Sequence, residues 1–249
     1  MDRLSRRAGP IEAILEKLPE FLIWYAVFLF TLAFHEGAHA LAAYWGGDDT
    51  AYRGGQVSLN PWPHIQREPF GTVIFPLLTF FMSGWMMGWA STPFDPRWGA
   101  AHPRRQAAMA AAGPAANLLL ALISFTILRA LLATGYFVPP ARINFSHMVE
   151  PSAAGAESFG FALALLLSVA LNLNVLLGLF NLLPIPPLDG AGILTGLAPA
   201  TFGQAVQRMA FNPAFRILGL LLAWKVFTPI AQWAFGVVLG LLHPQFSYS

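Results

Sequence analysis

The chain has 249 residues, of which 56% are hydrophobic and only 10% are charged. An ordinary soluble domain carries roughly 25% charged residues, so this composition excludes a soluble globule of that size. The lack of cysteine excludes disulfides, thiolate metal ligands and a cysteine nucleophile, and the net charge of +2 indicates no class of partner. Arg104 and Arg105 lie at the foot of an apolar block, which favours a membrane-surface anchor over a nucleic-acid contact.

Apolar residues are gathered into blocks that are each close to the ~20 residues needed to span hydrocarbon. The blocks are 21–44, 70–90, 107–133, 159–183 and 215–242. The polar connections between them are too short for a second folded domain. We therefore expect residues 1–249 to form one polytopic, all-α integral membrane domain with its core at 20–195 and with four to five transmembrane helices.

The first block is expected to be a helix that starts near Pro19 and ends at Gly46 and Gly47, because it contains no internal proline. Residues 50–60 follow it. They alternate weakly between apolar and polar side chains and include two adjacent glycines, which predicts a short β-hairpin after the first helix.

The second block differs from the others because Pro76, Gly84 and Gly88 interrupt it, which predicts a broken or re-entrant segment. Pro114 predicts a kink early in the third block. The fourth block ends in the sequence 181–190, where three prolines within four positions must unwind the helix.

The first helix carries the motif His35-Glu-Gly-Ala-His39, which places two imidazoles four residues apart on nearly the same helix face. Two nitrogen ligands can then meet one metal, while Glu36 takes a proton from the attacking water. The alternative is that neighbouring helices satisfy these polar groups without a metal. Ionisable groups at the bilayer centre cost about 2.5–3.5 kcal/mol each, which favours the functional interpretation.

A catalytic zinc normally has three protein ligands and an open position. Asp189 is the best-placed third ligand, because it follows a membrane-length helix at a proline-unwound end that can turn the carboxylate inward. The other candidates are histidines in polar connections or near the C-terminus, namely His64, His102, His147 and His243.

The chain resembles the site-2 proteases, intramembrane zinc metalloproteases, and in particular their short bacterial branch without a PDZ domain. The resemblance rests on four motifs in the family's order, which run through about 60% of the chain. They are His35-Glu-Gly-Ala-His39, Leu59-Asn-Pro-Trp-Pro-His64, Gly113-Pro-Ala-Ala-Asn117 and Asn181-Leu-Leu-Pro-Ile-Pro-Pro-Leu-Asp-Gly190.

This resemblance implies a peptide-bond hydrolase with one zinc ion per chain, held by His35, His39 and Asp189, and with Glu36 as general base. It also implies that Asn117 and Asn181 hold the substrate strand or polarise its carbonyl, although either could be an interhelical hydrogen bond instead. The implied setting is the bacterial plasma (inner) membrane. The implied partners are the lipid bilayer and a transmembrane protein substrate.

Two departures from the family pattern concern substrate preference and loop packing, not the metal site. Ala191 and Gly192 stand where a basic residue is expected, and residues 89–93 lack a lysine typical of this branch. Two other functions stay open on the sequence, a membrane metal transporter and a proteolytically inactive family member that acts as a binding partner. The oligomeric state stays open as well.

One metal that meets both His39 and Asp189 constrains the topology. The helix ends that follow His39 and precede Asp189 must face the same side of the membrane, so the first and fourth blocks must run parallel. Only one of the two intervening blocks can then cross the membrane. Because the second block is interrupted, it is predicted to be the one that does not cross.

Overall fold

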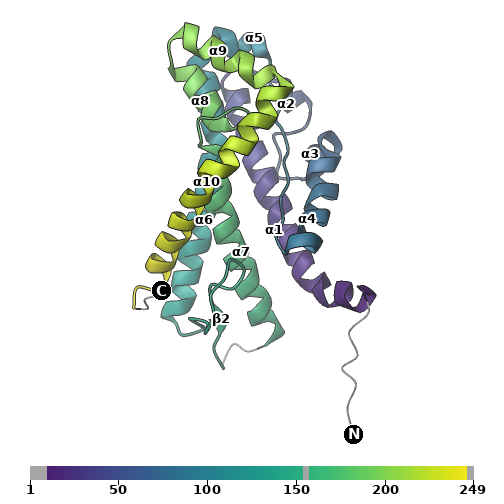
Figure 1. Cartoon of the computed structure of the whole chain (residues 1–249), viewed down its shortest axis with the longest axis vertical. Helices are drawn as coiled ribbons and strands as arrows, with labels where there is room; N and C mark the ends of the chain where they lie inside the picture. The colour runs from purple at the N-terminus through teal and green to yellow at the C-terminus, as the bar shows by residue number, and fades with distance from the viewer. Residues whose placement is uncertain (1–9, 154–156, 246–249) are drawn as a thin grey trace.

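The computed structural model describes residues 10–153 and 157–245, and long apolar helices dominate it (Figure 1). Within this part of the chain, four helices are long and apolar enough to cross a membrane. They are α1 (Pro10–Trp45), α6 (Pro103–Ala133), α7 (Ser158–Asn181) and α10 (Pro213–Leu242). The expectation of an all-α membrane protein with four to five spans is therefore confirmed, with four such helices.

The long helices alternate in direction. Figure 1 shows α1 and α7 rising from the end that holds the N-terminus, whereas α6 and α10 descend towards that end. The parallel arrangement that a shared metal site requires of the first and fourth apolar blocks is thus present.

Helix α1 begins earlier than expected. It starts at Pro10, and Pro19 lies inside it, so the prediction of a start near Pro19 is wrong. The residues between these prolines are mostly strong helix formers, which extend the helix past a proline that lacks one backbone donor. Figure 1 shows the first turns of α1 bent away from the rest, as expected where a proline interrupts the hydrogen-bond ladder.

The predicted hairpin at 50–60 is wrong. Thr50–Arg53 forms a helical turn, α2, and residues 56–60 form no strand. Asp48 accepts hydrogen bonds from the backbone and the hydroxyl of Thr50, two residues later, and this local side-chain contact bends the chain into the turn. The described part of the chain has its two-stranded antiparallel sheet elsewhere, between α6 and α7, where β1 (Phe137–Val138) pairs with β2 (Glu150–Pro151).

The second apolar block is interrupted, as predicted. After α3 (Trp62–Arg67), the chain forms a π-helical turn, η1 (Phe70–Ile74), and then α4 (Phe75–Ser83). These 14 helical residues reach about 21 Å, which is less than the ~30 Å hydrocarbon core. Residues 85–95 then run without regular structure to α5 (Pro96–Ala101), which lies at the same end as α2 in Figure 1. The block is thus re-entrant.

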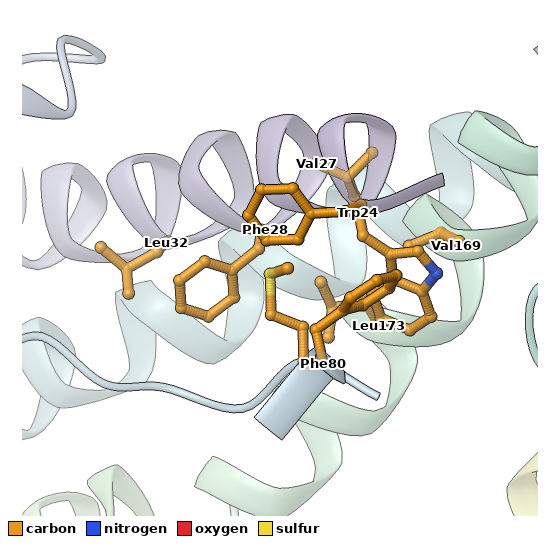
Figure 2. Close-up of a cluster of buried hydrophobic side chains, with 9 residues drawn as sticks. Trp24, Val27, Phe28, Leu32, Phe80, Val169 and Leu173 are labelled. Carbon is orange, nitrogen blue, oxygen red and sulfur yellow. The ribbon is translucent and has the colours of Figure 1, made fainter. Parts of the chain in front are cut away.

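A buried apolar cluster holds the re-entrant segment against the long helices (Figure 2). Trp24 and Phe28 on α1, Phe80 on α4, and Val169 and Leu173 on α7 belong to it, and each is at most 2% exposed. Lipid is as apolar as these side chains, so close van der Waals packing is what favours this contact over lipid contact. The cluster keeps the unwound residues that follow α4 beside α1.

Two shorter helices connect α7 to α10. They are α8 (Asp189–Leu197) and α9 (Ala200–Phe211), and both lie at the end of the molecule where α1 finishes and α6 begins (Figure 1). The proline-rich residues 182–188 separate α7 from α8, so the predicted unwinding is confirmed. The first residue of α8 is Asp189.

Candidate metal centre

The two motif histidines lie on one face of α1. His35 is 9% exposed and His39 is 5% exposed, and their Nε2 atoms are 3.0 Å apart. His39 lies six residues before the end of α1 at Trp45, which places it about 9 Å inside the helix end. The four-residue spacing therefore brings two imidazole nitrogens together inside a helix that is long and apolar enough to cross a membrane.

Asp189 reaches the same point from the other side. Its Oδ2 lies 3.2 Å from His35 Nε2 and 3.3 Å from His39 Nε2. The turn at 182–188 folds back so closely on α8 that a Cβ at Gly190 would overlap the carbonyl oxygens of Leu182 and Leu183. A glycine directly after the aspartate is what permits this turn, and the turn aims the carboxylate at the histidines.

The hydrogen-bond partners of the two Nδ1 atoms determine which nitrogen of each histidine carries the hydrogen. His35 Nδ1 lies 2.5 Å from Asn117 Oδ1, and His39 Nδ1 lies 2.7 Å from the carbonyl oxygen of Met109. Both partners are acceptors, so each Nδ1 donates its hydrogen and each neutral ring keeps a lone pair on Nε2. Asp189 Oδ2 then receives no hydrogen bond although two nitrogens lie close to it.

When both rings are neutral, as metal ligation requires, three lone pairs converge on one point. The ligand atoms of His35, His39 and Asp189 all lie within 4.8 Å of one another. A proton on one ring could satisfy a single contact, whereas a divalent cation satisfies all three. Tetrahedral zinc ligands at 2.0–2.1 Å lie about 3.3 Å from each other, close to the 3.0–3.3 Å separations here. The donor set fits zinc and leaves its fourth position open.

Helix α6 closes the site on a further side. A Cβ added at Gly113 would overlap His39 Nε2 and would lie 2.6 Å from His35 Nε2. Only a residue without a side chain lets α6 approach α1 this closely. The glycine of the Gly113-Pro-Ala-Ala-Asn117 motif thus makes room for the centre, while its asparagine contacts His35.

Glu36 directly follows His35 in the chain but does not belong to the three-residue group. It is 6% exposed, and the hydroxyl of Thr92 lies 2.7 Å from its Oε2 and 3.0 Å from its backbone carbonyl oxygen. Thr92 comes from the unwound residues after α4. Sequence reasoning missed Thr92, because nothing in its local sequence indicates a contact with a residue 56 positions earlier.

The other candidate ligands lie elsewhere in the structure. His102 Nδ1 is 3.2 Å from the Trp98 carbonyl oxygen, His147 contacts Asn144, and His243 Nε2 is 2.8 Å from the Met148 carbonyl oxygen.

His64 is fully buried on α3, and it is not part of the His35, His39 and Asp189 group. Burial lowers the pKa of His64.

The two asparagines expected near the substrate differ in their surroundings. Asn117 is fully buried, and both its amide oxygen and its amide nitrogen are engaged. Asn181 is half-buried at the end of α7, where its Nδ2 donates to the Leu177 carbonyl oxygen at 3.1 Å. The structure therefore brings Asn117 to the metal centre and leaves Asn181 at the edge of the unwound turn.

Comparison with known proteins identifies the class. The profile of Peptidase family M50 matches residues 23–224. The chain is 35% identical over 183 residues to Putative zinc metalloprotease YwhC of Bacillus subtilis, covering 73% of this chain and 71% of that protein. It is 30% identical over 222 residues to Putative zinc metalloprotease Rip2 of Mycolicibacterium smegmatis, covering 89% and 67%. No solved structure matches.

The chain belongs to Peptidase family M50, the family of the site-2 proteases. The resemblance drawn from its motifs is thereby confirmed. It is a metalloprotease by family and an integral membrane protein by its four apolar helices.

Proposed function

We propose that this chain is an intramembrane endopeptidase that cleaves peptide bonds in or near transmembrane segments of other membrane proteins. His35, His39 and Asp189 hold one zinc ion, and Glu36 is the general base. The observation that carries this proposal is the convergence of three ligand atoms within 4.8 Å among apolar helices, with a buried carboxylate beside them. Two relatives named as zinc metalloproteases support zinc as the metal.

When bound, zinc supplies Lewis-acid chemistry, which polarises the scissile carbonyl and lowers the pKa of water to about 7. The residues of the chain supply the proton transfers. Glu36 takes one proton from the attacking water and delivers it to the amine that leaves when the carbon–nitrogen bond breaks. One carboxyl and one amine product result, and Glu36 returns to its starting state.

The contact with Thr92 gives the two carboxylate oxygens of Glu36 different roles. Its hydroxyl donates to Oε2 at 2.7 Å, so Oε1 is the oxygen that exchanges protons with water and amine. A hydroxyl donor also stabilises the ionised carboxylate, which is the form a base needs before the reaction. Thr92 thus acts as a positioning residue for Glu36.

A substrate must be extended before its carbonyls become available, because a helix occupies them in internal hydrogen bonds. A hollow of about 250 Å³ lies between α1 and residues 57–59, and Gly37, next to Glu36, lines it. Its remaining lining is largely apolar and includes Phe34, Leu41 and Val57. An apolar side chain of an unwound transmembrane segment fits this hollow.

We place the protein in the bacterial plasma membrane, as the bacterial relatives suggest.

The decisive experiment compares the wild type with Glu36→Gln, both purified in detergent. Metal content is measured by mass spectrometry, and cleavage is measured on a panel of single-pass membrane proteins with glycine or proline in the span. We expect Glu36→Gln to keep near-stoichiometric zinc and to lose at least ~10²-fold in turnover, because the side chain moves protons and is not a ligand.

Other outcomes identify the rival functions. Full activity of Glu36→Gln would refute the role of Glu36. Zinc flux into proteoliposomes without cleavage would indicate a transporter. If the wild-type protein retains zinc but shows neither cleavage nor zinc flux, the chain is an inactive family member that acts by binding. A Glu36→Gln chain bearing a photo-crosslinker at Leu59, beside the hollow, would then capture the bound segment.

A further inference from the structure

A chain of buried polar side chains leads away from the metal centre through three membrane-spanning helices. Asn117 on α6 donates from Nδ2 to Asn174 Oδ1 on α7 at 2.9 Å. Asn174 donates from its own Nδ2 to Thr31 Oγ1 on α1 at 2.9 Å and to the Ala170 carbonyl oxygen at 2.8 Å. Thr31, Asn117 and Asn174 are each at most 1% exposed.

The direction of these hydrogen bonds is determined at one end by a group that cannot rotate. The Ala170 carbonyl only accepts, so the NH2 group of Asn174 must face it. Thr31 takes the second hydrogen of the same NH2 group. The amide oxygen of Asn174 is then left for Asn117, which must turn its own NH2 group towards Asn174.

The same orientation reaches the metal ligand. With its NH2 group directed at Asn174, Asn117 presents Oδ1 to His35 Nδ1. An acceptor at this position holds the hydrogen on Nδ1 and the lone pair on Nε2, which faces Asp189 and His39. If the Asn117 amide were reversed, its NH2 group would face the Nδ1 hydrogen of His35. The neutral ring would then favour the hydrogen on Nε2, and Nε2 would offer no lone pair to a metal.

We infer that Asn174 and Thr31 are positioning residues of the metal centre, which set zinc affinity by fixing the orientation of the Asn117 amide. This inference rests on the proposed function. It assigns Asn117 to the support of His35 and not to the substrate. A partner bonded directly to a metal-ligating histidine, as Asn117 is to His35, typically contributes ~10–100-fold to metal affinity, and Asn174 and Thr31 act through that partner.

The rival interpretation is that the three residues only join helices. An interhelical hydrogen bond contributes to the stability of the apoprotein but has no effect on which nitrogen of His35 is protonated. The two interpretations therefore differ in zinc affinity and agree in apoprotein stability. Zinc affinity is measured on the full-length protein in detergent by competition with a chelator, independently of any cleavage.

Asn172 supplies a matched control for Asn174. It lies two residues earlier on α7, is 2% exposed, and donates to the Phe145 carbonyl oxygen at 2.7 Å, away from the metal centre. Asn174→Leu and Asn172→Leu each remove one buried amide from the same helix. We expect the zinc dissociation constant to rise by ~10-fold or more in Asn174→Leu and to stay within about 2-fold in Asn172→Leu.

Thr31 provides a test that does not depend on the folding of an asparagine variant. Thr31→Ser keeps the acceptor and should keep the wild-type dissociation constant, whereas Thr31→Val removes the acceptor and should raise the constant several-fold. Wild-type affinity in both Asn174→Leu and Thr31→Val, with a loss of apoprotein stability like that of Asn172→Leu, would overturn the inference. Absence of zinc binding by the wild type would refute the proposed metal site itself, whereas zinc binding without cleavage would refute only the proposed activity.

Discussion

The hydroxyl of Thr92 lies 2.7 Å from the Oε2 atom of Glu36, joining the re-entrant segment to the helix that carries both histidines. The contact spans 56 residues of sequence and is partly buried. The position of Glu36 therefore depends on the packing of α4, because the buried apolar cluster that contains Phe80 holds the segment to which Thr92 belongs.

Removal of this hydroxyl should slow catalysis without affecting the metal. A hydrogen bond to a charged group contributes about 1.5–3 kcal/mol, so Thr92→Val should lower kcat by ~10-fold or more with KM and zinc content unchanged. Thr92→Ser keeps the hydroxyl and should restore most of the rate. Ser91→Ala is the control, because Ser91 donates to Glu68 and not to Glu36. Equal rates for Thr92→Val and Ser91→Ala would show that the Thr92 contact has no catalytic role.

Loss of any one zinc ligand should deplete the bound metal. We expect His35→Ala, His39→Ala and Asp189→Ala each to weaken zinc binding by at least ~10²-fold, because the binding free energy is shared among few ligands. His147→Ala should bind zinc like the wild type, since His147 is exposed and contacts Asn144. Metal content measured after dialysis against a weak chelator tests this. Normal zinc content in Asp189→Ala would mean that another residue is the third ligand.

The close approach of α6 makes one glycine intolerant of a side chain. Gly113→Ala would place a methyl group against both imidazoles, so we expect it to abolish stoichiometric zinc binding while the protein still folds in detergent. Gly236→Ala on α10 is the control, because a Cβ there meets no atom within 4 Å. That change should leave zinc content intact and stabilise the helix by about 0.5–1 kcal/mol. Full zinc occupancy in Gly113→Ala would contradict the packing described for this centre.

The re-entrant path can be tested by labelling, because the chain contains no cysteine. Single cysteines at the exposed positions Arg53, Arg97 and Thr201 should react from one side of the membrane, and cysteines at Thr134 and Glu150 from the other. A membrane-impermeant maleimide, applied to right-side-out and inverted vesicles, distinguishes the sides. Labelling of Arg53 and Arg97 from opposite sides would show that the segment between them crosses the bilayer.

Features of this chain that depend on local sequence were predictable. The four-residue spacing of His35 and His39 places them on one helix face whatever surrounds the helix. The proline run before Asp189 unwinds any helix, and the structure brings that carboxylate to the histidines. Pro76 and the glycines after it indicated a block that would not span as a regular helix.

Features that depend on contacts between distant segments were not predictable. The alternation in 50–60 matched a strand, but side-chain and backbone bonds to Asp48 favour a helical turn at Thr50. The start of α1 was misplaced because Pro19 lies inside a helix that continues on both sides of it, and the local sequence does not distinguish such a proline from one at a helix start. The contacts of Thr92 with Glu36 and of Asn174 with Asn117 and Thr31 carry no local signal, because these partners lie at least 56 residues away in the sequence.

Because the re-entrant helix is short, the apolar helices on the two flanks of the molecule differ in length. On one flank α10 presents 30 helical residues, about 45 Å, with exposed apolar side chains. On the other flank, η1 and α4 reach only about 21 Å, and Phe70, Leu78 and Met82 face outward. Thinning of the bilayer beside α4 is one way to match this shorter apolar surface. We expect a helix that arrives from that side to lose part of its hydrocarbon surroundings before it reaches Glu36, which lowers the free energy needed to unwind it.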